Sequence, residues 1–244
     1  MQEVVYHSNF EIEESYFWFL ARNEILTKII KEKTDLKEND NVADIGCGTG
    51  GFAKVLSDSK YKVTCIDTEP LAIEYCKKRG LNDLHLGDLK TYINTNEKKF
   101  KAAFMLDVIE HIPDDQDVVN DVYKILDVGG YFIAAVPAYQ WLWSKHDEIH
   151  MHFRRYNKKN FEKLFINAGF EVTYKSYFNS FLFLPAVLKR FIDKITKNES
   201  DKPVDEVSSW MNSLFFKIFK SEKNLLGKFS LPFGLSVLLI AKKN

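Results

Sequence analysis

The ten residues VADIGCGTGG, at positions 42–51, constrain the fold of this chain more than any other segment. An apolar stretch runs directly into four glycines, and a helical pattern begins immediately after them. Glycine tolerates positive φ and lets the backbone approach a ligand closely, and the first N–H groups of the following helix are free to bind it. The segment therefore predicts a strand–turn–helix ligand site. Gly46, Gly48 and Gly51 also satisfy the G-x-G-x-x-G pattern, so glycine spacing alone does not identify the ligand.

Apolar runs of strand length alternate with helical patterns through the rest of the chain. Strands are predicted at residues 41–46, 61–66, 84–86, 101–106, 131–136, 170–176 and 236–242. Helices are predicted at residues 11–33, as one or two helices, and at 51–57, 70–79, 114–126 and 160–168. Gly129 and Gly130 are interpreted as the turn that leads into the fifth strand. This alternation indicates an α/β fold with a mostly parallel sheet covered by helices on both faces.

Two stretches interrupt the alternation, residues 137–157 and residues 177–233. The second is too long for a simple loop, and it holds helical apolar patterns at 182–195 and 207–219 on either side of the polar sequence NESDKP. We therefore predict three parts. They are an N-terminal helical cap (1–40), a Rossmann-like core (41–176 and 234–244) and a helical insertion or lid (177–233).

Phenylalanine and lysine are interleaved throughout the insertion. This composition is typical of an amphipathic helical layer packed on the main domain. It would also suit a lid over an apolar substrate, a dimer interface, or a patch that rests on a membrane surface. Both a monomer and a homodimer are compatible with the sequence.

The charge balance argues against a nucleic-acid-binding protein. Lys and Arg total 34, as do Asp and Glu, so the formal net charge is zero, whereas nucleic-acid binding normally requires a basic excess. The three cysteines, Cys47, Cys65 and Cys76, match no zinc or disulfide spacing. No apolar run reaches the roughly 18 residues of a membrane span, and the N-terminus lacks a signal-peptide pattern. These features predict a cytoplasmic protein.

Three acids narrow the identity of the ligand. Asp44 lies two residues before the first glycine, where it would repel a pyrophosphate and attract an ammonium group. Asp67 ends the second strand, where an acid can accept hydrogen bonds from two ribose hydroxyls. Asp88 follows the third strand, where it could accept from an adenine amino group, and the N–H of Leu89 could donate to a ring nitrogen. Together they indicate S-adenosylmethionine.

With these residues the chain resembles a class I S-adenosylmethionine-dependent methyltransferase. The matching segments are VADIGCGTG (42–50), CIDTEP (65–70), GDL (87–89) and MLDVIEHI (105–112). The resemblance implies a seven-stranded Rossmann-like sheet whose last strand is antiparallel, and S-adenosylhomocysteine as the product of the cofactor. It implies cofactor contacts at Asp44, Gly46, Cys47, Gly48, Gly50, Asp67, Thr68, Asp88, Leu89, Leu106 and Asp107.

The N-terminal segment ESYFWFLARNEIL narrows the resemblance. It is similar to the first helix of the type 11 and type 12, or ubiquinone-methylase-like, methyltransferases of small molecules. In that group an aromatic residue and an arginine close over the methionine end of the cofactor, which implies these roles for Trp18 and Arg22, with the arginine pairing to the cofactor carboxylate. A solvent-facing arginine on a packed helix is the alternative. The segment PFGLSVLLIAKK also resembles the last strand of that group.

Candidates for the chemistry lie at two places. His111 follows the fourth strand, at the edge where ligands of open α/β sheets bind, and Glu110 could orient it. Residues 137–157 would overhang the substrate pocket, and there His146 or His152 could be a base for removing a proton from an acceptor hydroxyl. Acceptor contacts are predicted in the same stretch at Tyr139, Trp143, Arg154 and Arg155, the arginines suiting an anionic group.

The sequence therefore predicts a methyltransferase acting on an oxygen or nitrogen of a small molecule, such as a sugar, a lipid-linked intermediate or a secondary metabolite. The spacing of His146, His150 and His152 matches no defined metal motif, so no metal is expected. The Asn/Asp-Pro-Pro-Tyr/Phe tetrapeptide of amino-group nucleic-acid methylases is absent. The alternatives are a catalytically silent cofactor-binding or partner protein of the same fold, and an NAD(P)-dependent oxidoreductase.

Overall fold

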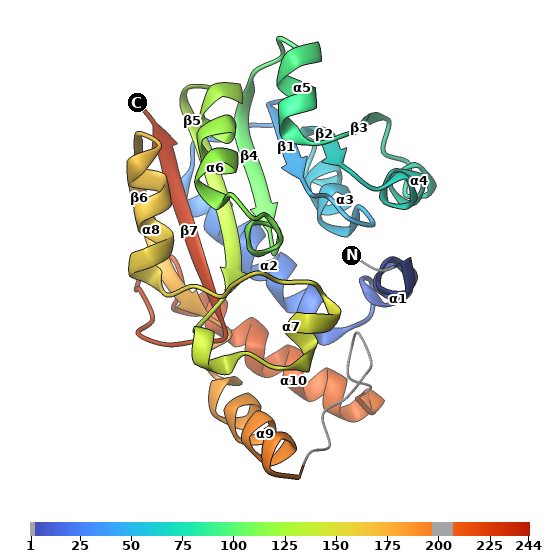
Figure 1. The fold of residues 1–244 in the computed structure, drawn as a ribbon, viewed down its shortest axis with the longest axis vertical. Coiled ribbons are helices and arrows are strands. Elements are labelled where there is room, and N and C mark those ends of the chain that lie inside the picture. The colour runs from blue at the N-terminus through green and yellow to red at the C-terminus, as the bar shows by residue number, and fades with distance from the viewer. Residues whose placement is uncertain (1–2, 197–206) are drawn as a thin grey trace.

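A computed structural model describes residues 3–196 and 207–244 of the chain, which are built around one sheet of seven strands (Figure 1). The strands are β1 (Asn41–Ile45), β2 (Lys62–Asp67), β3 (Asp83–Leu86), β4 (Phe100–Leu106), β5 (Leu126–Pro137), β6 (Phe170–Phe178) and β7 (Ser236–Lys243). Their order across the sheet is β3-β2-β1-β4-β5-β7-β6. Strands β1 to β5 pair in parallel, and β7 is antiparallel to both β5 and β6. The predicted Rossmann-like sheet with an antiparallel last strand is confirmed.

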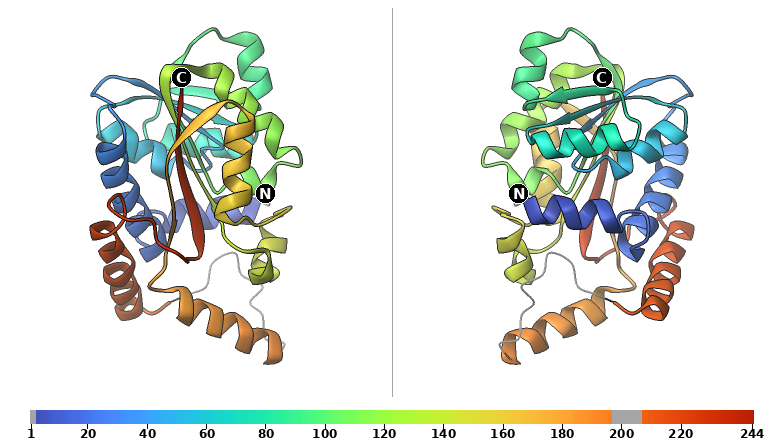
Figure 2. Two further views of the ribbon diagram at one scale, coloured as in Figure 1. Left: turned by 90° about the vertical axis from the view of Figure 1, so that its left-hand side faces the viewer. Right: turned by 90° about the vertical axis from the view of Figure 1, so that its right-hand side faces the viewer.

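The helices cover both faces of the sheet (Figure 2). They are α1 (Glu3–Ile12), α2 (Phe17–Lys33), α3 (Gly51–Asp58), α4 (Pro70–Lys78), α5 (Leu89–Thr95), α6 (Asp115–Ile125), α7 (Lys145–Ile149), α8 (Lys158–Asn167), α9 (Phe183–Thr196) and α10 (Ser209–Ser221). Helices α5, α6 and α8 bury their apolar stripes on one face, and α2, α3 and α10 pack on the other. Three helices, α1, α5 and α7, were not predicted. Helices α5 and α7 are single short segments with too few turns to show a helical period.

Local signals explain where several helices begin. Pro70 occupies the first turn of α4, where its missing N–H is not needed. Asp114 caps α6 by accepting a hydrogen bond from the N–H of Asp117 (3.0 Å). Asn157 caps α8 in the same way through the N–H of Asn160 (2.8 Å). These caps place the loops before α6 and α8 at the edge of the sheet where the site lies.

The predicted turn at Gly129–Gly130 is wrong in one respect: both glycines lie inside β5, which begins at Leu126. Phe100 pairs with Leu126, and the regular pairing with β4 resumes only at Ala102 and Tyr131, so the register shifts between them. Gly129 has φ +77°, and a Cβ on Gly130 would lie 2.8 Å from the carbonyl oxygen of Asp127. The glycines therefore serve an irregularity within the strand and not a free turn before it.

The described parts of the insertion form two α-helices, α9 and α10, that differ in their environment. Helix α10 packs on α2, where the Phe17 and Phe215 rings lie 5.3 Å apart and Glu24 pairs with two lysines of the insertion. Helix α9 has no buried residue and lies at one end of the molecule (Figure 1). The expected packed layer is therefore present for α10 and not for α9. The predicted linker NESDKP falls outside the described residues.

Residues 137–157, for which no helix was predicted, form a short 3-10 turn and helix α7. Helix α7 begins with a capping box in which Ser144 and Asp147 bond each other's backbone N–H. No helix in the described ranges is long and apolar enough to cross a membrane.

Candidate active site

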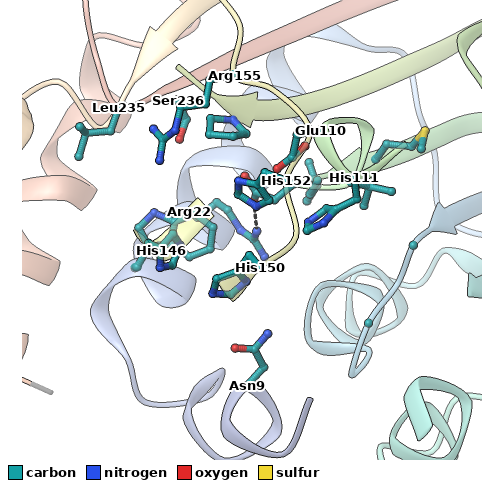
Figure 3. A pocket seen from close by; sticks show the side chains of 18 of the residues that line it. Asn9, Arg22, Glu110, His111, His146, His150, His152, Arg155, Leu235 and Ser236 are labelled. Atoms are coloured by element: carbon teal, nitrogen blue, oxygen red, sulfur yellow. Dashed lines mark hydrogen bonds and ion pairs between the residues drawn. The ribbon is translucent and has the colours of Figure 1, made fainter. Parts of the chain in front are cut away.

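A large cavity of about 1500 Å³ opens at the carboxyl ends of β1, β2, β4 and β5 (Figure 3). Helices α1, α2, α7 and α9 contribute to its walls, so the N-terminal segment and the insertion both reach the site. The position of the cavity agrees with the rule that ligands of open α/β sheets bind beyond the carboxyl ends of the strands.

The glycine loop after β1 has the strained backbone that its sequence predicts. Gly46 has φ +68° and Gly48 has φ +56°, which other residues rarely adopt. A Cβ on Gly46 would lie 2.6 Å from Val108, whereas a Cβ on Gly48 would meet nothing within 4 Å. Gly48 therefore lies beside open space that a ligand can fill. Gly50 does not line the cavity; it precedes α3, and a Cβ there would lie 2.8 Å from the sulfur of Cys76.

Asp67 is bound to the glycine loop. Its Oδ2 accepts a hydrogen bond from the N–H of Gly48 (2.9 Å), and its Oδ1 accepts one from the N–H of Glu69 (3.0 Å). Burial raises the pKa of Asp67 to about 6, although the two N–H groups oppose this shift. Each oxygen retains a second lone pair, so the carboxylate can still accept from two hydroxyls of a ribose.

Asp44 lines the cavity from the end of β1 and is only 3% exposed. Within the described residues its carboxyl group makes no hydrogen bond, and burial raises its pKa to about 8. A buried acid without a partner is destabilising unless a ligand supplies one. The observation fits a ligand with an ammonium group.

Arg22 reaches the cavity from α2 and is 6% exposed, so the alternative of a solvent-facing arginine is wrong. Its Nη1 donates to Oδ2 of Asp107 (2.7 Å), and its guanidinium carbon lies 4.5 Å from the centre of the Trp18 ring. Its Nε is buried and has no partner among the described residues. Burial raises the pKa of Asp107 against the opposing charge of Arg22. A free carboxylate entering here could accept from Arg22.

The remaining predicted cofactor residues, apart from Gly50, also line the cavity: Cys47, Thr68, Asp88, Leu89 and Leu106. Oδ1 of Asp88 caps α5 by accepting from the N–H of Thr91 (2.7 Å). This bond occupies one oxygen and leaves the other for a ligand. The cavity thus offers a carboxyl for an ammonium, an arginine for a carboxylate, and an acid for a ribose. These residues fit S-adenosylmethionine, which has all three groups.

The histidines gather beside Arg22, although the segments that follow β4 and form α7 are far apart in the sequence (Figure 3). The rings of His111 and His152 lie 4.6 Å apart. Nδ1 of His152 bonds Oδ1 of Asp147 (2.9 Å), so its Nε2 is not needed for that bond. Burial, with the neighbouring His152, lowers the pKa of His111 to about 3, and burial also lowers the pKa of His146. Both imidazoles are therefore uncharged near neutral pH and can bind a metal ion, but the same burial makes them weaker bases.

Asp147 is the centre of a buried network. Arg155 donates to both of its carboxylate oxygens (2.6 and 2.9 Å) and to the carbonyl of Ala138 (3.2 Å). Burial acts to raise the pKa of Asp147, but the hydrogen bonds from His152 and Arg155 outweigh it and hold that pKa below its usual range. The guanidinium of Arg155 is thereby directed at Asp147, so the geometry favours a role in orienting His152 over a contact with an anionic acceptor.

Glu110 is completely buried, and neither carboxylate oxygen has a partner among the described residues. Burial, together with the negative charge of Asp107, raises its pKa well above the usual range. One oxygen of Glu110 and one nitrogen each of His111 and His152 lie within 4.8 Å of one another, a grouping that could hold a metal ion. No metal was expected from the sequence because the spacing of His146, His150 and His152 matches no metal motif. That spacing gives no sign that Glu110 and His111 lie beside His152.

Only some of the predicted acceptor-contact residues line the cavity. Trp143 lines the cavity. Tyr139 does not; its ring stacks on Tyr177 at 5.0 Å. Arg154 also lies outside, where it pairs with Asp115 (2.9 Å) and donates to the carbonyl of Pro113 (2.7 Å). The geometry offers no support for acceptor contacts by Tyr139 and Arg154.

Helix α1 and the turn after it contribute residues that sequence reasoning missed. Glu13 accepts from the Thr49 hydroxyl of the glycine loop and pairs with Arg79 of the segment after α4 (3.1 Å). Tyr6 and Asn9 line the cavity from α1. The only available signal was an acid in the N-terminal segment, which does not specify a partner.

Comparisons with known proteins agree with this geometry. Residues 43–134 match the type 11 methyltransferase domain family. The sterol 24-C-methyltransferase of Kluyveromyces lactis is 28% identical over 156 residues, which cover 61% of this chain and 40% of that enzyme. The ubiquinone biosynthesis O-methyltransferase of Rickettsia typhi is 32% identical over 132 residues, or 50% of this chain and 52% of that enzyme. The chain thus spans about half the length of these curated relatives.

A solved structure extends the likeness to the whole fold. A S-adenosylmethionine-dependent methyltransferase from Archaeoglobus fulgidus superposes with a TM-score of 0.62. The superposition covers 96% of this chain and 99% of that one at 16% sequence identity. At this identity the likeness shows that the two proteins share a fold.

Proposed function

The chain belongs to the class I S-adenosylmethionine-dependent methyltransferases of type 11, and on that premise we propose that it transfers the methyl group to an oxygen or nitrogen of a small-molecule acceptor. The observation that carries the proposal is that candidate cofactor-binding residues and candidate catalytic histidines lie side by side in one cavity. Asp44, Arg22 and Asp67 offer partners for the three polar parts of the cofactor, and His111 and His152 lie beside them.

Each residue has a distinct proposed task. Asp44 binds the ammonium of the methionine moiety, Arg22 its carboxylate, and Asp67 the ribose hydroxyls. The bound cofactor supplies an electrophilic methyl group. The protein then has to position the acceptor in line with that group and exclude water.

His152 is the proposed base for an acceptor hydroxyl. Its Nδ1 donates to Asp147, which fixes the tautomer and leaves Nε2 to take the proton. Arg155 is a positioning residue, because it acts through Asp147. His111, neutral and 4.6 Å from His152, and His146 in the same wall are the other candidates. A neutral amine acceptor would need positioning alone.

The insertion is proposed to close the acceptor side of the cavity. Leu182, just before α9, and Pro185 and Ala186, in its first turn, line the cavity. This supports a division into cap (1–40), core (41–176 and 234–244) and lid (177–233). The apolar lining favours an acceptor with a hydrophobic part. The similarity of the chain to sterol and ubiquinone methyltransferases favours the same kind of acceptor.

Calorimetric titration with S-adenosylhomocysteine tests the cofactor assignment. Wild type should bind saturably, and Asp67→Ala should bind about 10- to 150-fold more weakly, the equivalent of about 1.5–3 kcal/mol for hydrogen bonds to a charged group. Asp58→Ala is the matched control, because Asp58 is an exposed acid at the end of α3. Equal affinities for the two variants would contradict the ribose assignment.

Transfer of a labelled methyl group to a panel of hydroxyl and amine acceptors tests turnover. Apolar acceptors should be included because of the cavity lining. Cofactor binding without transfer to any acceptor would favour the catalytically silent alternative. Binding of NAD or NADP in place of S-adenosylhomocysteine would favour the oxidoreductase.

A further inference from the structure

All three cysteines of the chain meet at one place, although their spacing in the sequence gives no sign of it. Cys47 lies in the glycine loop, Cys65 in β2 and Cys76 in α4. All are free thiols and buried, at 8%, 0% and 0% exposure. Their sulfur atoms lie within 4.8 Å of one another, and the sulfurs of Cys47 and Cys76 are 3.6 Å apart.

The distances suit a common metal ion. Three thiolates bound about 2.3 Å from one ion lie about 3.8–4.0 Å from one another. The Cys47–Cys76 separation of 3.6 Å is slightly shorter than these values and the other two separations are at most 4.8 Å, so small side-chain rotations would complete the geometry. We propose that Cys47, Cys65 and Cys76 form a binding site for one thiophilic d10 metal ion, Cu(I) or Zn(II).

The surroundings decide which ions the site can accept. Ala53 and Leu81 are buried in the same cluster, and Val63 and Leu84 pack against it. Hard ions such as Mg²⁺ and Ca²⁺ require oxygen ligands and are excluded by sulfur in an apolar setting. In the described ranges the cluster includes no fourth side-chain ligand. Trigonal sulfur therefore suits Cu(I), whereas Zn(II) would need a water as its fourth ligand.

An ion can enter the cysteine site from the large cavity, and its binding would restrain the glycine loop. Cys47 also lines the large cavity, so an ion can reach the sulfurs from there. Cys47 stands between Gly46 and Gly48, and the N–H of Gly48 holds Asp67. A metal ion would thus connect the glycine loop to β2 and α4 and fix the loop that positions Asp67. The metal site itself does not depend on the proposed methyl transfer.

Metal titration of the fully reduced protein under anaerobic conditions tests the proposal. Cu(I) and Zn²⁺ are added separately against a chelator of each ion, and stoichiometry is read by native mass spectrometry. We expect one ion per chain from at least one of the two titrations, and protection of all three thiols from an alkylating reagent. The ion that binds with the higher affinity is the one for which the site is suited.

Two variants and one spectrum separate the thiols from other ligands. Cys65→Ala/Cys76→Ala should weaken binding by more than about 100-fold, beyond the effect of an outer-shell residue. His111→Ala/His152→Ala is the control, because it removes the nitrogen ligands of the Glu110 grouping and should leave thiol binding unchanged. X-ray absorption of the metal-loaded wild type, which needs no variant to fold, should show sulfur neighbours at about 2.3 Å.

The proposal is overturned by any of three results. These are retention of no ion in either titration, equal affinity in the double cysteine variant, and a shell of only nitrogen and oxygen neighbours. Circular dichroism of the double cysteine variant shows whether it is folded, and if it is not, the absorption spectrum of wild type decides alone.

Discussion

Replacing Asp44 by Asn should stabilise the protein while it weakens cofactor binding. Asp44 is 3% exposed, makes no hydrogen bond within the described residues, and has a pKa raised by burial to about 8. In the unfolded chain an Asp carboxyl has a pKa of about 3.9. From about pH 5 to about pH 8 the native protein therefore holds a proton that the unfolded chain has lost, so the free energy of unfolding falls as the pH rises.

The size of the effect follows from this window. Each pH unit inside it is worth about 1.4 kcal/mol, so Asp44 lowers the free energy of unfolding by about 2–3 kcal/mol between pH 5 and pH 7. Asn does not titrate. Relative to wild type, Asp44→Asn should thus gain about 2–3 kcal/mol over that interval, or about 4–12 °C in Tm for a chain of this size. Affinity for S-adenosylhomocysteine should fall about 10- to 150-fold, because its ammonium loses a charged partner.

Urea unfolding at pH 5, 6 and 7 measures the first effect, and calorimetry at pH 7 the second. Asp58→Asn, at an exposed acid outside the cavity, is the control and should change neither quantity by a comparable amount. A difference in unfolding free energy between variant and wild type that stays constant from pH 5 to pH 7 would refute the buried-acid reasoning. Unchanged affinity would refute the ammonium contact.

Three further predictions concern the same cavity. Arg22→Lys should not restore cofactor affinity to the wild-type level, since a lysine cannot pair with Asp107 and also present a second planar donor to a carboxylate; equal calorimetric affinities would contradict this. His152→Gln should lower kcat by about 10²- to 10⁴-fold for a hydroxyl acceptor while cofactor affinity stays within about threefold; an unchanged kcat across the pH range would remove His152 as the base. Asp147→Asn should lower the free energy of unfolding by about 3–5 kcal/mol, because Arg155 is left as an uncompensated buried charge; urea unfolding with a loss below about 1 kcal/mol would be inconsistent with the buried pair.

Much of the cofactor side could be predicted because it is encoded locally. The glycine loop, Asp44 and Asp67 all sit at or next to strand ends, and parallel strands bring their carboxyl ends to one edge. Their order in the sequence therefore determines their place in the site. Asp88 belongs to the same group, since it follows β3 at that edge.

The acceptor side could be predicted only in part. His111 and His152 were both candidates, but their approach to 4.6 Å depends on how residues 137–157 fold back over β4. Tyr139 and Arg154 come from that same stretch and lie outside the cavity. An irregular segment has no period that assigns side chains to a face. Residue type alone therefore could not show that His111 and His152 line the cavity whereas Tyr139 and Arg154 do not.

The sequence by itself determined the α/β class, the mostly parallel sheet and the position of the cofactor loop, because alternating apolar runs and glycine turns are local properties of the chain. The antiparallel last strand was expected only from the resemblance to the methyltransferase family. Only the tertiary structure decided which distant side chains share a partner. Arg22 and Asp107 are 85 residues apart and meet at 2.7 Å, and Cys47 and Cys76 are 29 apart and meet at 3.6 Å. Such pairings depend on strand order and on how helices pack across the sheet, and the spacing of residues along the chain carries no information about either.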